Sequence, residues 1–139
     1  MAVKAYSGTY TWEEARTKCS QDGIDVKAEL PAPRGSIENK FYVDVAKGYG
    51  IALGSDKFWL GVNDIDVADE YTDQNGNPHT YFSWANSQPE SHAQRCVQAG
   101  GFQGYNWHDI MCTDAKSLLC VVGKAVISNQ IQTKRIIFS

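Results

Sequence analysis

The chain has 139 residues, of which 42% are hydrophobic and 21% charged, and its formal net charge is −3. This length suits one domain with a substantial core, and the composition excludes general disorder. Lys and Arg form no run longer than Lys134-Arg135, which argues against a nucleic-acid binder. No apolar stretch approaches the roughly 20 residues that span a bilayer. The N-terminal MAVKAYSG lacks the apolar region of a signal peptide.

The segment after Thr11 predicts a first helix. Thr11-Trp12-Glu13-Glu14 is a capping box, in which the Thr11 hydroxyl accepts an amide of the first turn and Glu14 reaches back. Apolar residues then recur at helical spacing as far as Cys19, and Gly23 ends the helix.

A second helix is predicted to begin at Ser36 and to end at Gly48, after the non-helical segment PAPRG, residues 31–35. Ile37, Phe41 and Val45 share one face of this helix.

The second half of the chain predicts short strands separated by turn-rich segments. The predicted strands are residues 58–65, 80–84, 96–99 and 117–122. Two helices followed by a loop-rich set of strands indicate the α+β class.

The C-terminal segment, residues 124–139, differs in character, so we divide the chain into a domain of residues 1–123 and this tail. The tail has β-branched residues but no cysteine or tryptophan. It is a candidate oligomerisation strand, the start of a further domain, or a terminus without a function of its own.

The four cysteines are Cys19, Cys96, Cys112 and Cys120, and no two form a C-x-x-C pair. This pattern speaks against a zinc ribbon or a thioredoxin-like site and favours two disulfides, hence an oxidising compartment. Four cysteines allow three pairings, and their spacing does not choose among them. Four buried free thiols are the alternative.

Several motifs together resemble the C-type lectin-like domain. They are YTWEEARTKC, PAPRGSIENKF, FWLGVNDI, TYFSWANSQPES, RCVQ, YNWHDIMC and LLC, which follow that family's order from about Tyr6 to Val122. The resemblance implies the pairs Cys19–Cys120 and Cys96–Cys112. It also implies the short form of the fold, with two helices, small antiparallel sheets and a long irregular ligand-binding loop region.

The resemblance further implies one calcium site in that loop region. The residues that match the family's ligands are Gln88, Glu90, Gln94, His108 and Asp109. Ca²⁺ takes six to eight oxygen ligands, but Gln94 stands where the family has a carboxylate, and His108 has no oxygen to give. Two carboxylates remain, so we expect a site weaker than the family's usual one.

The family's second calcium site is expected to be lost. Asp64 is kept, but Ala68, Ser91 and Arg95 stand where acidic or amide ligands are expected.

The motif Gln88-Pro89-Glu90 resembles the Q-P-D type that the family associates with galactose, more than the E-P-N type associated with mannose. The sugar-binding residues implied are Gln88, Glu90, His92, His108 and Asp109. His92 would stack on the sugar, or it is simply a solvated loop residue. His108 is a sugar contact, a structural residue or, as a lower-ranked alternative, a zinc ligand.

Among the other aromatic residues, we expect Trp59 and Trp84 in the core and Trp107 beneath the loop. His79 follows Pro78 in a turn and is expected at the surface.

We therefore expect a secreted or extracellular lectin domain that binds glycans with Ca²⁺ and prefers galactose-type sugars, with a homodimer as its candidate assembly. The rival is a lectin-like domain that binds protein or another non-sugar ligand without calcium. We expect no enzyme, because the chain has no G-x-S-x-G, phosphate-binding or H-E-x-x-H motif.

Overall fold

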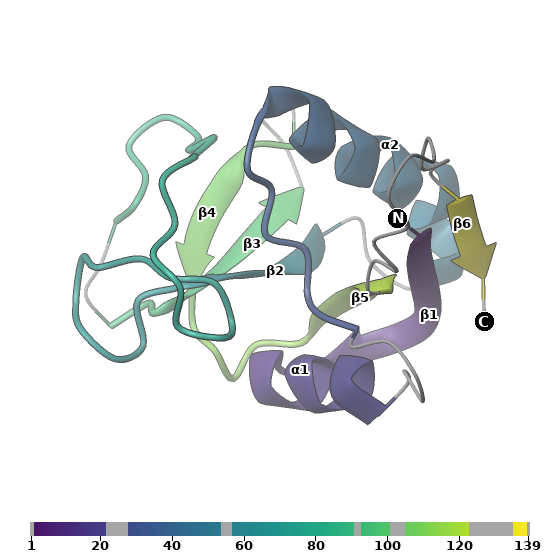
Figure 1. The fold of residues 1–139 in the computed structure, drawn as a ribbon, viewed down its shortest axis with the longest axis horizontal. Helices are drawn as coiled ribbons and strands as arrows, with labels where there is room; N and C mark the ends of the chain where they lie inside the picture. The colour runs from purple at the N-terminus through teal and green to yellow at the C-terminus, as the bar shows by residue number, and fades with distance from the viewer. Residues whose placement is uncertain are drawn as a thin grey trace, which may run out of the picture.

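The computed structural model describes residues 2–21, 28–53, 57–90, 93–100, 105–122 and 135–138. Its centre is a six-stranded sheet with the strand order β4-β3-β2-β5-β1-β6 (Figure 1). The strands are Ala2–Tyr10 (β1), Lys57–Asn63 (β2), Cys96–Gly100 (β3), Trp107–Ile110 (β4), Lys116–Val122 (β5) and Arg135–Phe138 (β6). The helices are Trp12–Gln21 (α1) and Ser36–Leu53 (α2). This arrangement confirms the predicted α+β class.

The sheet is mixed. The pairs β1–β5, β2–β3 and β3–β4 are antiparallel, as expected. They join into one sheet because β2 pairs with β5 in parallel at Phe58 and Ser117. At the other edge, β6 also runs parallel to β1.

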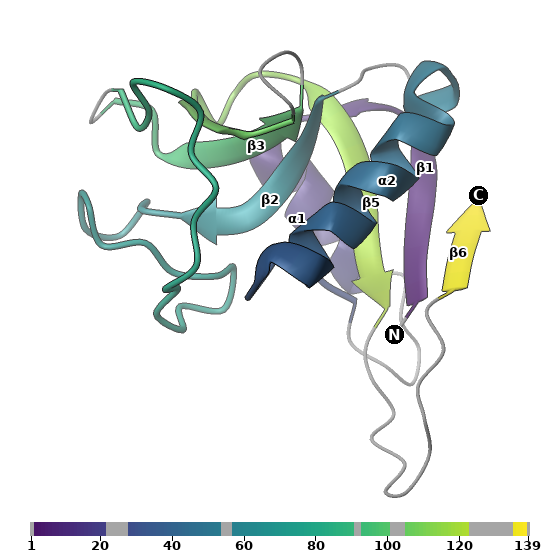
Figure 2. The same ribbon diagram turned by 90° about the horizontal axis from the view of Figure 1, so that it is seen from above.

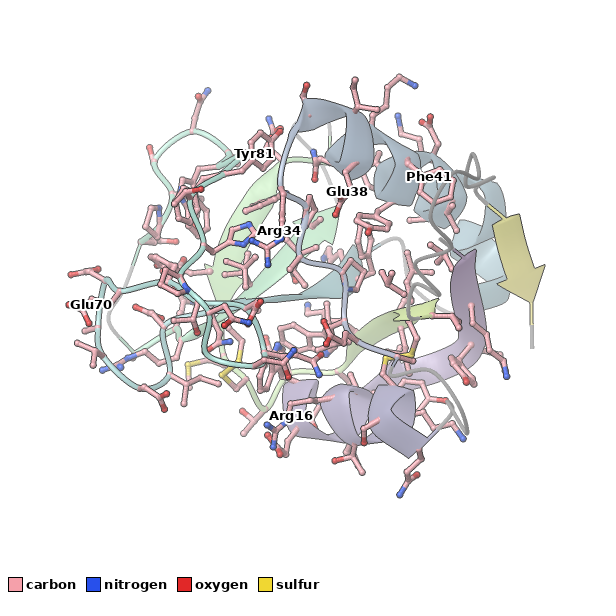
Figure 3. All side chains as sticks on the ribbon, in the orientation of Figure 1. Arg16, Arg34, Glu38, Phe41, Glu70 and Tyr81 are labelled. Atoms are coloured by element: carbon pink, nitrogen blue, oxygen red, sulfur yellow. A yellow bond between two sulfur atoms is a disulfide. The ribbon has the colours of Figure 1, made fainter. Side chains whose placement is uncertain are left out.

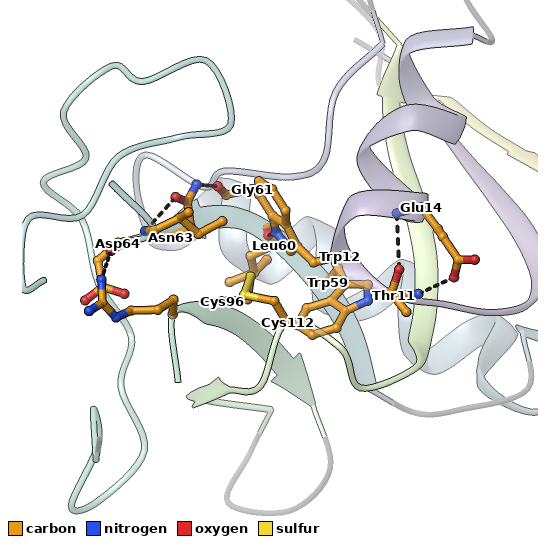
Figure 4. Close-up of a disulfide and its surroundings, with 12 residues drawn as sticks. Thr11, Trp12, Glu14, Trp59, Leu60, Gly61, Asn63, Asp64, Cys96 and Cys112 are labelled. Atoms are coloured by element: carbon orange, nitrogen blue, oxygen red, sulfur yellow. Dashed lines mark hydrogen bonds between the residues drawn. A yellow bond between two sulfur atoms is a disulfide. The ribbon is translucent and has the colours of Figure 1, made fainter. Parts of the chain in front are cut away.

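Helix α1 begins with the predicted capping box. The Glu14 amide donates to the Thr11 hydroxyl at 3.3 Å, and the Thr11 amide donates to the Glu14 carboxylate at 2.9 Å. Trp12, Ala15 and Cys19 are buried. The Trp12 indole N–H donates to the Leu60 carbonyl at 2.8 Å, which fixes α1 on β2 (Figure 4).

Helix α2 packs on the opposite side of the sheet from α1 (Figures 1 and 2). It continues past the predicted end at Gly48 to Leu53, since a glycine inside a helix costs only about 1 kcal/mol. The predicted apolar face is wrong at its start, because Ile37 is 79% exposed. The buried side chains are Tyr42, Val43, Val45 and Ala46.

Both disulfides form as the resemblance implied. Cys19–Cys120 ties α1 to β5, with 5.4 Å between the Cα atoms. Cys96–Cys112 joins the start of β3 to the segment after β4, with 5.1 Å between the Cα atoms (Figure 4). No free cysteine is present.

The segment from Asp64 to the start of β3 contains no regular strand in its described residues, 64–90 and 93–95. The predicted strand 80–84 is wrong, because the segment makes only an isolated bridge, between Trp84 and Trp107. This loop region lies at the opposite end of the molecule from β6 and the chain termini (Figures 1 and 2). Neither described helix is long and apolar enough to cross a membrane.

Candidate functional site

A tight turn before Gln88 brings the predicted ligand residues beside β4. The Ala85 amide donates to the Trp107 carbonyl at 2.9 Å, and the Gln88 amide donates to the Ala85 carbonyl at 3.1 Å. The peptide bond between Gln88 and Pro89 is cis. Since β4 carries Asp109, this turn places residues 88–90 next to that carboxylate.

Three hydrogen bonds then link Gln88, Glu90 and Asp109 in a closed cycle, which we call the polar ring. The Gln88 amide group donates to the Glu90 carboxylate at 3.2 Å. The Glu90 backbone N–H donates to Asp109 Oδ2 at 2.8 Å. The Asp109 backbone N–H donates to Gln88 Oε1 at 3.2 Å. The cycle therefore holds Gln88 and Glu90 beside Asp109, although these residues lie 21 and 19 positions from it in sequence.

The polar ring is buried at one side and open at the other. Asp109 is 3% exposed, whereas Gln88 is half-buried and Glu90 is exposed. A ligand can therefore reach the exposed members of the ring, while Asp109 is held by the surrounding structure.

The remaining predicted site residues lie outside these three hydrogen bonds. Gln94 is half-buried, and its Oε1 is a buried acceptor with no hydrogen-bond donor among the described residues. His108 is half-buried in β4, between the buried Trp107 and Asp109. His92 lies outside the described residues.

The chemistry of this donor set fits a hard cation. Glu90 and Asp109 offer carboxylates, and Gln88 and Gln94 offer amide oxygens. Gln94 Oε1 receives no hydrogen bond among the described residues, so a cation or a water molecule would satisfy it. Within the described residues, no three His, Cys, Asp or Glu side chains form a metal-holding group.

At the family's second calcium position, Arg95 contacts Asp64. The Asp64 amide donates to the Arg95 carbonyl at 3.0 Å, and Arg95 Nη1 donates to the Asp64 carbonyl at 3.1 Å. The Asp64 carboxylate accepts the Asp69 amide at 2.9 Å. A guanidinium so close repels a metal ion, so these residues do not fit a second calcium.

An aromatic cluster lies beneath the loop region. Trp107 is fully buried, as predicted, and its indole N–H donates to Asn39 Oδ1 at 3.0 Å. The rings of Tyr81, Phe82 and Trp84 lie within 5.7 to 6.2 Å of it, centroid to centroid. Tyr81 is on the loop side of the molecule (Figure 3). Trp59 is fully buried as expected, but Trp84 is only half-buried.

His79 is not the surface residue predicted. It is 5% exposed, and its Nε2 lies 2.8 Å from the Pro33 carbonyl, to which it donates. Its Nδ1 is buried and has no partner among the described residues. Burial lowers the pKa of His79, although the Pro33 carbonyl opposes this. The prediction was wrong because contact with residues 46 positions away decides this burial.

Tyr71 lies between the aromatic cluster and the acidic residues of the loop. Burial raises its pKa, and the carboxylates of Asp64, Asp109 and Asp69 raise it further, while Arg95 lowers it. The Tyr71 hydroxyl is therefore protonated at neutral pH and lies in a negative electrostatic environment.

Comparison with known proteins agrees with this fold. Residues 8–122 match the family model of the lectin C-type domain, and the chain therefore belongs to the C-type lectin domain family. It is a lectin-type domain, not an enzyme. A tetranectin-like protein of Carcharhinus perezii is 32% identical over 117 residues, which cover 84% of this chain and 67% of the relative. The C-type lectin domain family 3 member A homolog of Xenopus laevis is 29% identical, and the match covers 84% of this chain and 57% of the relative.

Solved structures share the fold. The EPNH mutant of CEL-I superposes with a TM-score of 0.73 at 19% identity, covering 85% of this chain and 86% of that chain. A calcium-independent type II antifreeze protein superposes with a TM-score of 0.70, also at 19% identity, over 85% of this chain and 82% of that chain. The same fold therefore carries different activities.

Proposed function

We propose that this domain binds a sugar at the polar ring with the help of one Ca²⁺. The observation that supports this most is the cycle of three hydrogen bonds that brings Gln88, Glu90 and Asp109 together, with Glu90 exposed to solvent. Their hydrogen bonds hold the side chains in place before a ligand arrives, which lowers the entropy cost of binding.

The calcium assignment rests on charge and ligand type. Glu90 and Asp109 would supply two negative charges, and Gln88 and Gln94 two neutral oxygens. When bound, Ca²⁺ would supply open coordination positions for two sugar hydroxyls. These four side chains carry only six oxygens, and three of them accept hydrogen bonds within the polar ring, so water or sugar must complete the shell. We expect an affinity at the weak end of extracellular modules, roughly 10⁻³ M.

The proposed preference is for galactose-type sugars over mannose. Gln88 brings an amide that both donates and accepts, whereas Glu90 brings only acceptors at neutral pH. In this sequence the amide precedes the proline and the carboxylate follows it, as in the Q-P-D type of the family. In the E-P-N type the two groups are exchanged.

Calorimetry tests the proposal directly. We expect heat from calcium binding, and then calcium-dependent binding of methyl β-galactoside that exceeds binding of methyl α-mannoside. Glu90→Gln should abolish both signals, because it removes one of two carboxylates. Glu70→Gln is the matched control, since Glu70 is an exposed acid of the outer loop (Figure 3) and should leave both signals intact. Absence of calcium-dependent sugar binding would refute the proposal.

A second candidate is a lectin-like domain that binds a protein or another non-sugar ligand without calcium. The closed cycle of hydrogen bonds favours it, because the ring partners satisfy carboxylate oxygens that calcium would otherwise bind. Melting with and without a chelator separates the two candidates. Calcium binding raises the melting temperature of the first and leaves that of the second unchanged.

We further propose that the protein acts outside the cell and as a homodimer. Two disulfides suit an oxidising compartment. Single lectin sites bind weakly, so avidity needs several sites on one assembly. The tail, residues 124–139, is the proposed dimer contact, and its strand β6 is an edge strand of the sheet. A monomeric sedimentation profile of the intact chain would refute the dimer.

A further inference from the structure

Tyr71, Phe82 and Trp84 form an aromatic surface, which we call the aromatic platform. Phe82 stacks on Trp84, with 5.8 Å between ring centroids and 9° between ring planes. The Tyr71 ring meets Phe82 at 5.6 Å and Trp84 at 5.4 Å, both edge to face. Three rings from two loop segments are therefore packed into one rigid surface.

The platform is partly open to solvent, unlike Trp107 beneath it. Phe82 is 37% exposed, and Tyr71 and Trp84 are half-buried, whereas Trp107 beneath them is fully buried. Phe is among the residues most often fully buried. A stacked, partly exposed Phe supported from below by a buried Trp has the properties of a contact surface for a ligand with an apolar face.

The platform also adjoins the polar ring. Trp84 directly precedes Ala85, whose amide donates to the Trp107 carbonyl at 2.9 Å and whose carbonyl accepts the Gln88 amide at 3.1 Å. Trp84 forms a bridge with Trp107, on the strand that carries Asp109. Tyr71 lies close enough to Asp109 for that carboxylate to affect its hydroxyl. A ligand held at the ring therefore has the platform as its neighbour.

We propose that the aromatic platform is a second sugar subsite, which takes the apolar face of a pyranose linked to the sugar at the polar ring. This inference rests on the proposed sugar binding. A pyranose has a C–H face that packs on aromatic rings and a rim of hydroxyls that form hydrogen bonds with water and with exposed polar groups. The carboxylates of Asp64, Asp109 and Asp69 act electrostatically on the Tyr71 hydroxyl, and Arg95 opposes them. The second sugar is therefore an uncharged one, and sialylated or sulfated sugars are repelled.

The test compares a monosaccharide with a disaccharide. In calcium, calorimetry should show that lactose binds the unchanged chain more tightly than methyl β-galactoside does. Phe82→Ala should remove this advantage, a loss of about threefold to tenfold for lactose, as one aromatic contact contributes. The affinity for methyl β-galactoside should not change. Ile37→Ala is the matched control, because it removes an exposed apolar side chain from α2, which contributes nothing to the platform.

Two further readouts make the test independent of folding defects. Phe82→Leu keeps the apolar volume and loses the aromatic face, so it should weaken lactose binding, whereas Phe82→Tyr should preserve it. Of the four tryptophans only Trp84 is partly exposed, so lactose and not methyl β-galactoside should change the tryptophan fluorescence. If galactoside binds but lactose binds no better, or if all Phe82 variants bind lactose equally, the platform is overturned while the proposed function stands. If neither sugar binds, both are overturned.

Discussion

Removing the two disulfides one at a time should have different effects on stability and on binding. Cys19–Cys120 closes a separation of 101 residues between α1 and β5, and Cys96–Cys112 closes one of 16 residues beside β4. We expect the long bridge to contribute more to stability and the short bridge to contribute more to ligand binding.

Loop-closure entropy gives the contribution of each disulfide to the free energy of unfolding. For separations of 101 and 16 residues, it gives about 4.7 and about 3 kcal/mol at 25 °C. Both are large fractions of the roughly 5 to 15 kcal/mol that stabilises a typical domain. The short bridge adjoins Arg95, which contacts Asp64, and it fixes the end of the strand that carries Asp109. Its loss should therefore loosen the polar ring.

Urea denaturation and calorimetry of two double variants check both expectations. Cys19→Ala with Cys120→Ala should lose the larger free energy of unfolding, and its folded fraction should bind ligand normally. Cys96→Ala with Cys112→Ala should lose less stability but bind ligand more weakly. Equal losses of stability, or weaker binding in the long-bridge variant alone, would refute this reasoning.

Three further predictions concern single residues. Burial holds the pKa of His79 below its ordinary value of 6.5, so the unfolded chain binds a proton at this residue more readily than the folded chain does. The contribution of His79 to the free energy of unfolding should therefore be fully present above pH 6.5 and should be lost as the pH falls below that value. Melting curves of the unchanged chain and of His79→Gln should show a flatter pH dependence in the variant. Thr11→Ala should lower the free energy of unfolding by about 1 kcal/mol, because the Glu14 amide loses its cap, while Thr11→Ser should not; identical urea curves would contradict this. Gln94→Glu should raise calcium affinity about tenfold by restoring a third carboxylate, and an unchanged calcium titration would show that this residue is not a ligand.

Local sequence signals predicted the parts of the fold that depend on local chemistry. The capping box at Thr11 places the start of α1 because its two hydrogen bonds join residues three apart. The resemblance implied both disulfides because the family's pairing carries over to its four cysteine positions, whereas the spacing of the cysteines left three pairings open. The polar ring residues were found in the same way, as a motif around Pro89 and another after Trp107.

Features that depend on contacts between distant residues were not predicted. Strands β1 and β4 were missed, because pairing with β5 and β3 makes them strands. The segment 80–84 has the composition of a strand, but its aromatic side chains pack as the cluster under the loop. The burial of His79 follows from a carbonyl 46 residues away. No pattern near these residues contains that information.

The number of carboxylates in the polar ring affects the shape of the loop as well as its affinity for a metal. Two of its three hydrogen bonds are donated by backbone amides, so the ring depends on how the turn at residues 85–90 lies against β4. Glu90 and Asp109 are the carboxylates of the ring, and the Gln88 amide group connects them. It donates to the Glu90 carboxylate and accepts the backbone N–H of Asp109. A third carboxylate at position 94 or 88 would add repulsion that only a cation relieves. On the proposed function, the neutral residues at these positions would weaken calcium binding and, for the same physical reason, would let the loop keep its shape without calcium.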